Sequence, residues 1–146
     1  MKKIFYLFII IFFKFNIAHS LIEVDITRGN LDPLPIAVSP LHVDIQSEKY
    51  EDIKIKELGN LISSVIEKNF KSTGLFNPLN KDAFVQKPDI AHLKPRFEDW
   101  RLITAQALVT GKLLIKDDKL KVEFRLWDLA ASKEIIALAF TTTPSN

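Results

Sequence analysis

The chain has 146 residues, no cysteine, and 20 Lys and Arg residues against 18 Asp and Glu residues. This length allows one domain with a modest core and excludes a multidomain enzyme. The absence of cysteine excludes disulfides, thiolate catalysis and the lipid attachment of a bacterial lipoprotein. Three lysines lie in the first 14 residues; without them 17 basic residues stand against 18 acidic ones, so the basic surface of a nucleic-acid binder is not expected.

Residues 1–20 have the pattern of a secretory signal peptide. Two lysines precede an apolar run over residues 4–13, and Ala18-His19-Ser20 supplies small residues before a cleavage site. The alternative is an uncleaved membrane anchor, which needs about 20 apolar residues, whereas this run is interrupted at Lys14. We therefore predict cleavage between Ser20 and Leu21, a mature domain over residues 21–146, and no integral membrane segment after cleavage.

The mature chain begins with a segment in which apolar and polar residues alternate, as in a half-buried β-strand. Its residues are Leu21, Ile22, Glu23, Val24, Asp25, Ile26 and Thr27. Turn-forming residues and two prolines follow over 28–35, so the strand is joined to the domain by an independent connector. Such a strand can dock on its own sheet or on the sheet edge of another protein. The pattern alone favours an ordinary docked edge strand.

The next predicted elements are a short apolar strand at 35–41, a loop at 42–52 and a long helix at 53–73. The apolar residues of the helix recur at spacings of three and four, which predicts one buried stripe: Leu58, Leu61, Ile62, Val65, Ile66 and Phe70. Gly59 costs about 1 kcal/mol of helix propensity relative to Ala, which burial of the stripe can offset. Gly74 suits the left-handed residue that often ends a helix.

Beyond the helix, residues 74–85 predict an irregular extended segment that can pair at a sheet edge. A loop bounded by prolines is expected over 86–95. Residues 97–103 predict two helical turns that point three residues inward: Phe97, Trp100 and Ile103.

Three strands are predicted at the end of the chain, at 105–116, 120–127 and 134–141. The middle strand alternates apolar and charged residues, and Asp117-Asp118 can form the tight turn before it. The predicted fold class is therefore α/β, a mixed β-sheet with a C-terminal three-stranded antiparallel meander covered by helices. Trp127 falls on the polar face of its strand, so either a bulge turns it inward or another element covers that face.

No group of residues predicts catalysis. His42 and His92 lie far apart in the sequence without metal-ligand spacing, so we expect two loop histidines and no metal site. The glycines do not cluster into a phosphate-binding loop, and adjacent aspartates at a hairpin tip point apart into solvent. We expect no catalytic residues and no cofactor.

Several separated motifs, in the correct order, resemble the amino-terminal domain of the TolB family. They are DWR at 99–101, AQALVTG at 105–111, LKVEFRLWD at 120–128, PIAV at 35–38 and STGLFNPL at 72–79. The family domain is an α/β sandwich in a periplasmic component of the Tol-Pal envelope system. The resemblance implies periplasmic localisation and a non-enzymatic role in outer-membrane integrity and envelope constriction at cell division.

The resemblance also implies a partner-binding role for Leu21–Thr27. In the family, the start of the mature chain engages the inner-membrane protein TolA, and its ordering is coupled to binding of the lipoprotein Pal. We therefore expect TolA to bind this strand by strand addition, with Ile22, Val24 and Ile26 filling pockets.

Family members continue beyond the point matched by residues 140–144 into a further helix and a β-propeller, and the propeller binds Pal. Pal binding is therefore not carried over to this sequence. Without the further helix, apolar surface should remain open on the sheet, which forfeits about 25 cal/mol per Å² and favours cover by a partner chain or by self-association. Two alternatives remain open at this point: a truncated or split-gene remnant without activity, and a small periplasmic ligand-binding protein or enzyme.

Overall fold

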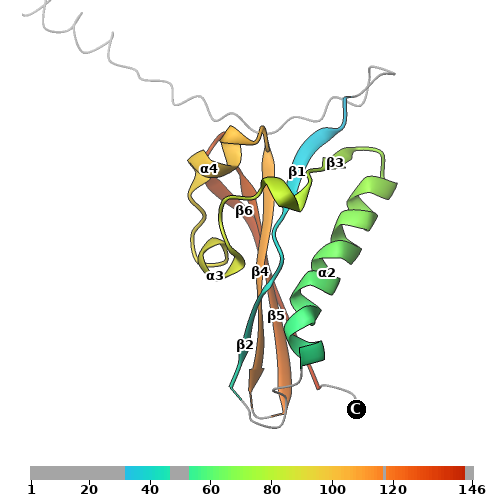
Figure 1. The fold of residues 1–146 in the computed structure, drawn as a ribbon, viewed down its shortest axis with the longest axis vertical. Helices are drawn as coiled ribbons and strands as arrows, with labels where there is room; N and C mark the ends of the chain where they lie inside the picture. Colours follow the sequence, from blue (N-terminus) through green and yellow to red (C-terminus); the bar gives the residue numbers. More distant parts are fainter. Residues whose placement is uncertain (1–31, 47–52, 117, 144–146) are drawn as a thin grey trace, which may run out of the picture.

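The computed structural model describes residues 32–46, 53–116 and 118–143, which form one mixed β-sheet between helical layers (Figure 1). The predicted signal peptide at 1–20 and the predicted strand at 21–27 lie outside the described residues. In chain order the elements are β1 (Leu34–Val38), β2 (His42–Ile45), α2 (Ile53–Ser72), β3 (Phe76–Pro78), the 3-10 turn η2 (Lys81–Ala83), α3 (Pro88–Ala91), α4 (Phe97–Leu102), β4 (Ala107–Lys116), β5 (Lys119–Asp128) and β6 (Lys133–Thr142).

The last three strands form the antiparallel meander that the sequence predicts. β4 and β5 pair without interruption over ten residues each, and β6 pairs along the other side of β5 with a register shift between Leu126 and Trp127. Asp118, in the turn between β4 and β5, has a φ of 57°, a left-handed conformation that aspartate adopts more readily than most residues. The predicted hairpin is confirmed.

The prediction of a loop at 42–52 was wrong for its first residues, which form β2. β1 pairs in parallel with the first part of β4, and β2 pairs in parallel with its last part. The two short strands therefore run one after the other along the same edge of β4. Only Val43 and Ile45 carry the apolar alternation in β2, which is too short a pattern to predict a strand. β3 pairs with the outer side of β1. This agrees with the prediction that the segment 74–85 can pair at a sheet edge.

α2 ends one residue before the predicted boundary, and Gly74 adopts the expected left-handed conformation with a φ of 71°. Two half-buried residues of α2, Ile66 and Phe70, pack against a buried cluster of the sheet. This cluster consists of Ile36, Val38, Ala107 and Val109. The buried stripe is narrower than predicted, because Leu61 is 60% exposed and Val65 is 53% exposed.

The opposite face of the sheet is covered by α3, α4 and the loops around them (Figure 1). Buried Trp100 packs there with Leu108 and Trp127. Trp127 is inward because α4 covers its face: its ring lies 5.8 Å from that of Phe97, and its Nε1 donates a hydrogen bond to Thr110 Oγ1 at 2.9 Å. α3 lies inside the predicted loop at 86–95, where Pro88 begins the short helix.

The helical cover of the meander is incomplete. α2 lies against β1, β2 and β3, whereas every residue of β6 is exposed. The predicted mixed sheet with a C-terminal meander and helical cover is confirmed, although in the described part of the chain the cover does not extend over β6.

Candidate functional site

The predicted partner-binding strand, Leu21–Thr27, and the cleavage position at Ser20 and Leu21 lie outside the described residues. The chain that follows them enters the sheet at Leu34, the first residue of β1. The Leu34 backbone N–H donates to the Leu75 carbonyl at 2.9 Å, just before β3. The described end of the predicted connector, at Leu34, therefore lies at the β1 and β3 side of the sheet.

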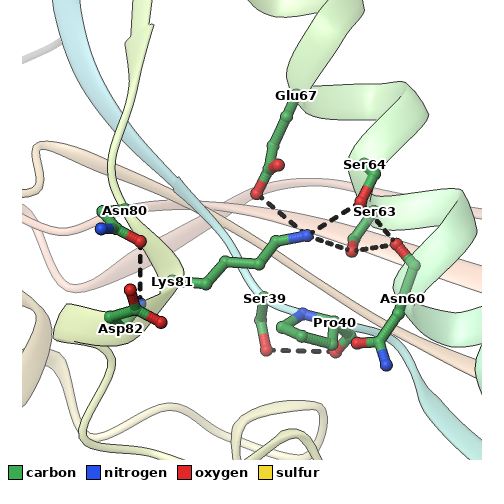
Figure 2. Close-up of polar contacts among 9 residues, drawn as sticks. All are labelled: Ser39, Pro40, Asn60, Ser63, Ser64, Glu67, Asn80, Lys81 and Asp82. Carbon is green, nitrogen blue, oxygen red and sulfur yellow. Dashed lines mark hydrogen bonds and ion pairs between the residues drawn. The ribbon is translucent and has the colours of Figure 1, made fainter.

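A polar network joins α2 to η2 around Lys81 (Figure 2). The Lys81 ammonium donates to Ser63 Oγ at 2.9 Å and to Ser64 Oγ at 3.2 Å, and it lies 3.3 Å from Glu67 Oε1. Both serine hydroxyls donate to the Asn60 carbonyl at 2.9 Å. Glu67 Oε1 is buried and receives no hydrogen bond, so its contact with Lys81 is an ion pair without hydrogen-bond geometry.

A serine beside a lysine can act as a nucleophile with its base, but this geometry favours a structural role. Ser63 is fully buried, and its hydroxyl already donates to Asn60. The Lys81 side-chain nitrogen donates to both hydroxyls and accepts a hydrogen bond from neither. The network therefore fastens η2 to α2.

His42 and His92 lie together, although the sequence places them far apart. Their rings stack with centroids 4.3 Å apart and an interplanar angle of 5°. His42 lies in β2 and His92 ends α3, so both are half-buried rather than the solvated loop residues that were predicted. The His92 ring Nδ1 lies 2.9 Å from the Pro88 carbonyl.

Charged groups from three elements surround this histidine pair. Burial lowers the pKa of His42 from its ordinary value of 6.5, and His92 and Lys112 lower that pKa further, while Asp44 and Asp89 act in the opposite direction. Lys112 forms an ion pair with Asp44 at 2.8 Å, and this hydrogen bond lowers the pKa of Asp44. The His42 side chain therefore favours the neutral imidazole more than a solvated histidine does.

β6 presents a row of exposed apolar side chains. Ile136 and Leu138 are each 49% exposed, and Phe140 is 58% exposed. The Phe140 ring contacts Phe124 of β5 edge-on, with centroids 6.3 Å apart. We call Ile136, Leu138 and Phe140 the β6 surface. An exposed apolar row of this kind is typical of a protein contact.

Two further observations concern the described residues only. They contain no group of three or more His, Cys, Asp or Glu side chains placed to hold a metal ion. Among their helices, none has both the length and the apolar character needed to cross a membrane.

The sequence signals for these features differ in strength. The β6 surface is visible in the sequence, because Ile136, Leu138 and Phe140 alternate with two alanines, but the pattern does not say whether a helix covers it. The histidine pair has no sequence signal, since the pairing of β2 with β4 and the position of α3 bring the two rings together.

Comparison with known proteins places the chain in a family. The family model described as the TolB amino-terminal domain matches residues 22–135. The chain is 62% identical over 148 aligned residues to the Tol-Pal system protein TolB of Pelagibacter ubique (strain HTCC1062). That alignment covers 100% of this chain and 32% of the relative, so the chain spans about a third of the relative's length.

Solved structures agree on the fold. TolB from Acinetobacter baumannii matches with a TM-score of 0.56 at 16% identity, covering 77% of this chain and 24% of that chain. The LpoB C-terminal domain from Salmonella enterica matches with a TM-score of 0.55 at 8% identity, covering 80% of this chain and 87% of that one. The family match, which extends over most of the sequence, and the shared fold lead to one conclusion: the chain belongs to the TolB amino-terminal domain family.

Proposed function

We propose that this chain is a non-enzymatic periplasmic component of the Tol-Pal envelope system, which serves outer-membrane integrity and envelope constriction at cell division. The observation that carries the proposal is the 62% identity to a Tol-Pal system protein TolB over the whole of this chain. The structural role of the network around Lys81 is consistent with a binding protein. Because the aligned part is 32% of the relative, we assign no Pal contact to these residues.

The proposed contact is the alternating strand Leu21–Thr27. Cleavage between Ser20 and Leu21 would make it the first segment of the exported protein, ahead of the connector that enters β1. N-terminal sequencing of the exported chain should then begin at Leu21. In this position the strand can add to a sheet edge of TolA, where its backbone provides the register and Ile22, Val24 and Ile26 fill pockets.

Calorimetric titration with TolA from the same organism tests the proposal, using the full chain recovered after export. We expect Val24→Ser to weaken binding about tenfold, since an apolar side chain of this size contributes about 1.5 kcal/mol when buried. The matched control is Asp25→Asn on the opposite face of the strand, which should change the affinity little.

Two outcomes would contradict this assignment. Equal binding by the wild type and the Val24→Ser variant would place the TolA contact outside the strand. Absence of binding by the folded wild-type chain would reject the TolA partnership and favour the interpretation as a remnant without activity.

A further inference from the structure

One edge of β2 is unpaired within the described part of the chain. β2 pairs with β4 alone. The position outside β1 is filled by β3, whereas no described strand fills the same position outside β2. This edge is separated from β5 and β6 by the whole width of β4. The open position therefore lies in line with β3, at the opposite side of the sheet from the last two strands.

The unpaired backbone groups of this edge belong to Val43 and Ile45. A strand in a parallel pair bonds to one neighbour through every second residue. The Gln46 N–H donates to the Ile115 carbonyl, in β4, at 2.9 Å. Val43 and Ile45 occupy the alternate positions, so their N–H and C=O groups point away from β4. Within the described ranges, no residue forms a hydrogen bond with these outward groups.

A groove of about 650 Å³ runs along this edge. α2 and α3 lie on opposite sides of β2 (Figure 1), and the groove is lined by β2, by Asn60 of α2 and by residues 87–89 at the start of α3. The two helices would obstruct the sheet of a second folded copy. A single extended segment has only to lie about 4.8 Å from β2, so the groove suits one added strand.

The two faces of β2 offer different surfaces to such a strand. A Cβ atom built on Gly59 would lie 3.0 Å from Val43 Cγ2, so Val43 faces α2, and Ile45 shares that face because side chains alternate along a strand. His42 and Asp44 lie on the other face, where His42 stacks on the histidine that ends α3. An added strand therefore meets apolar side chains toward α2 and polar ones toward α3.

We propose that this groove binds an extended segment of a partner protein by strand addition to β2. The backbone of the segment pairs with the outward groups of Val43 and Ile45, and apolar side chains at every second residue contact the α2 face. The unpaired backbone and the alternation of the groove walls are the observations that carry this assignment. The site shares no residue with the proposed TolA contact at 21–27, so either proposal can fail without the other.

The predicted strand of the chain itself, at 21–27, is a poorer occupant of the groove. Thr27 can extend at most about 25 Å from Leu34, whereas Val43 lies about 30 Å from Leu34 along the edge. Only the first residues of that strand could reach β2, and β3 already occupies the direct route beside β1. A segment of another protein has no such limit.

Amide hydrogen exchange of the full exported chain tests the proposal. The probe is a short synthetic peptide of alternating valine and threonine, with lysine at each end for solubility. It should slow the exchange of the Val43 and Ile45 amides about tenfold and leave the amide of Gln46, which is already bonded to β4, nearly unchanged. Of two further peptides, N-methylated at the valines or at the threonines, one should lose this effect, because strand addition uses one edge of the peptide.

Proline substitution provides the second test. Val43→Pro removes an outward N–H and leaves the bonds to β4 in place, so it should weaken probe binding about tenfold in calorimetry. Val43→Ala is the matched control, because it loses the packing against α2 but keeps the N–H, and it should weaken binding much less. Ile45→Pro removes the next outward N–H and keeps the test decisive if Val43→Pro does not fold, which circular dichroism shows.

The proposal is overturned if about 1 mM probe leaves the exchange of both amides unchanged, or if the folded proline variants bind the probe as tightly as the wild type. It is also overturned if the Val43 and Ile45 amides of the free full chain are already as protected as that of Gln46. That result would assign the edge to a segment of the chain itself.

Discussion

At the scale of single residues, a close backbone contact explains why position 59 is a glycine. A Cβ atom at Gly59 would lie 2.3 Å from the Leu41 carbonyl oxygen, and the Leu41 N–H donates to the Gly59 carbonyl at 3.2 Å. α2 therefore approaches the link between β1 and β2 more closely than any other residue at 59 would allow. From the sequence, Gly59 only weakens a helix, because its partner lies in a distant segment.

We expect Gly59→Ala to lower the free energy of unfolding by about 1–3 kcal/mol, the usual cost of overpacking. This direction is opposite to the gain of about 1 kcal/mol that alanine gives in an open helix. Urea denaturation measures the difference. Asn69→Ala, at an exposed position of the same helix, is the control and should be neutral or slightly stabilising. A Gly59→Ala chain as stable as the wild type would show that the close approach is not needed.

At the scale of elements, the helix and the strands with long apolar repeats were predicted correctly, and two short elements were not. α2 and the three meander strands carry long apolar repeats, and their boundaries were predicted within one or two residues at most ends. β2 and α3 are short, and their conformation depends on β4 and on Pro88 rather than on a repeat. Their contact through His42 and His92 therefore could not be predicted.

Because of the contact between His42 and His92, we expect the stability of the folded protein to depend on pH. The pKa of His42 is lower in the folded protein than in the unfolded chain. At a pH between these two pKa values, the unfolded chain therefore binds more protons at His42 than the folded protein does. Stability therefore decreases as the pH falls through about 6.5. The carboxylates with lowered pKa values, Asp44, Asp99 and Glu123, remain ionised until a lower pH and so do not affect this window.

We expect the melting temperature of the wild type to decrease between pH 7.5 and pH 5.5, and the decrease to be smaller in a His42→Asn variant. Thermal unfolding at several pH values measures both. Lys133→Ala, at an exposed site on β6, serves as the control and should keep the wild-type pH dependence. An equal decrease in the His42→Asn variant would assign the effect to other groups.

At the scale of the whole molecule, two apolar cores lie on opposite faces of the same strands. Ile36 and Val38 of β1 face α2, while Ala37 between them belongs to the core under α3 and α4. β4 contributes Val109 to the first core and Leu108 to the second. The alternation of apolar and polar residues along the strands predicted a sheet covered by helices. Which face each helix covers depends on how β1, β2 and β3 pair in parallel with their neighbours. These pairings join distant segments, so no local sequence pattern predicts them.

Because both cores share β1 and β4, we expect them to unfold together. Phe70 of α2 packs edge-on against Phe76 with centroids 4.8 Å apart, and Phe70→Ala should remove about 2 kcal/mol, less than for a fully buried phenylalanine. The two tryptophans of the chain, Trp100 and Trp127, lie in the core on the opposite face. The urea midpoint of unfolding should nevertheless decrease by the same amount whether it is measured by tryptophan fluorescence or by far-ultraviolet circular dichroism.

Lys68→Ala, at an exposed position of α2, is the control for this comparison and should move neither signal, since lysine and alanine have similar helix propensities. If Phe70→Ala shifted the circular dichroism and left the tryptophan transition in place, α2 would unfold separately from the rest of the sheet. Coincident shifts would instead mean that the β-sheet transmits a loss of packing from one face to the other. The domain would then respond as one unit to any partner that binds either face.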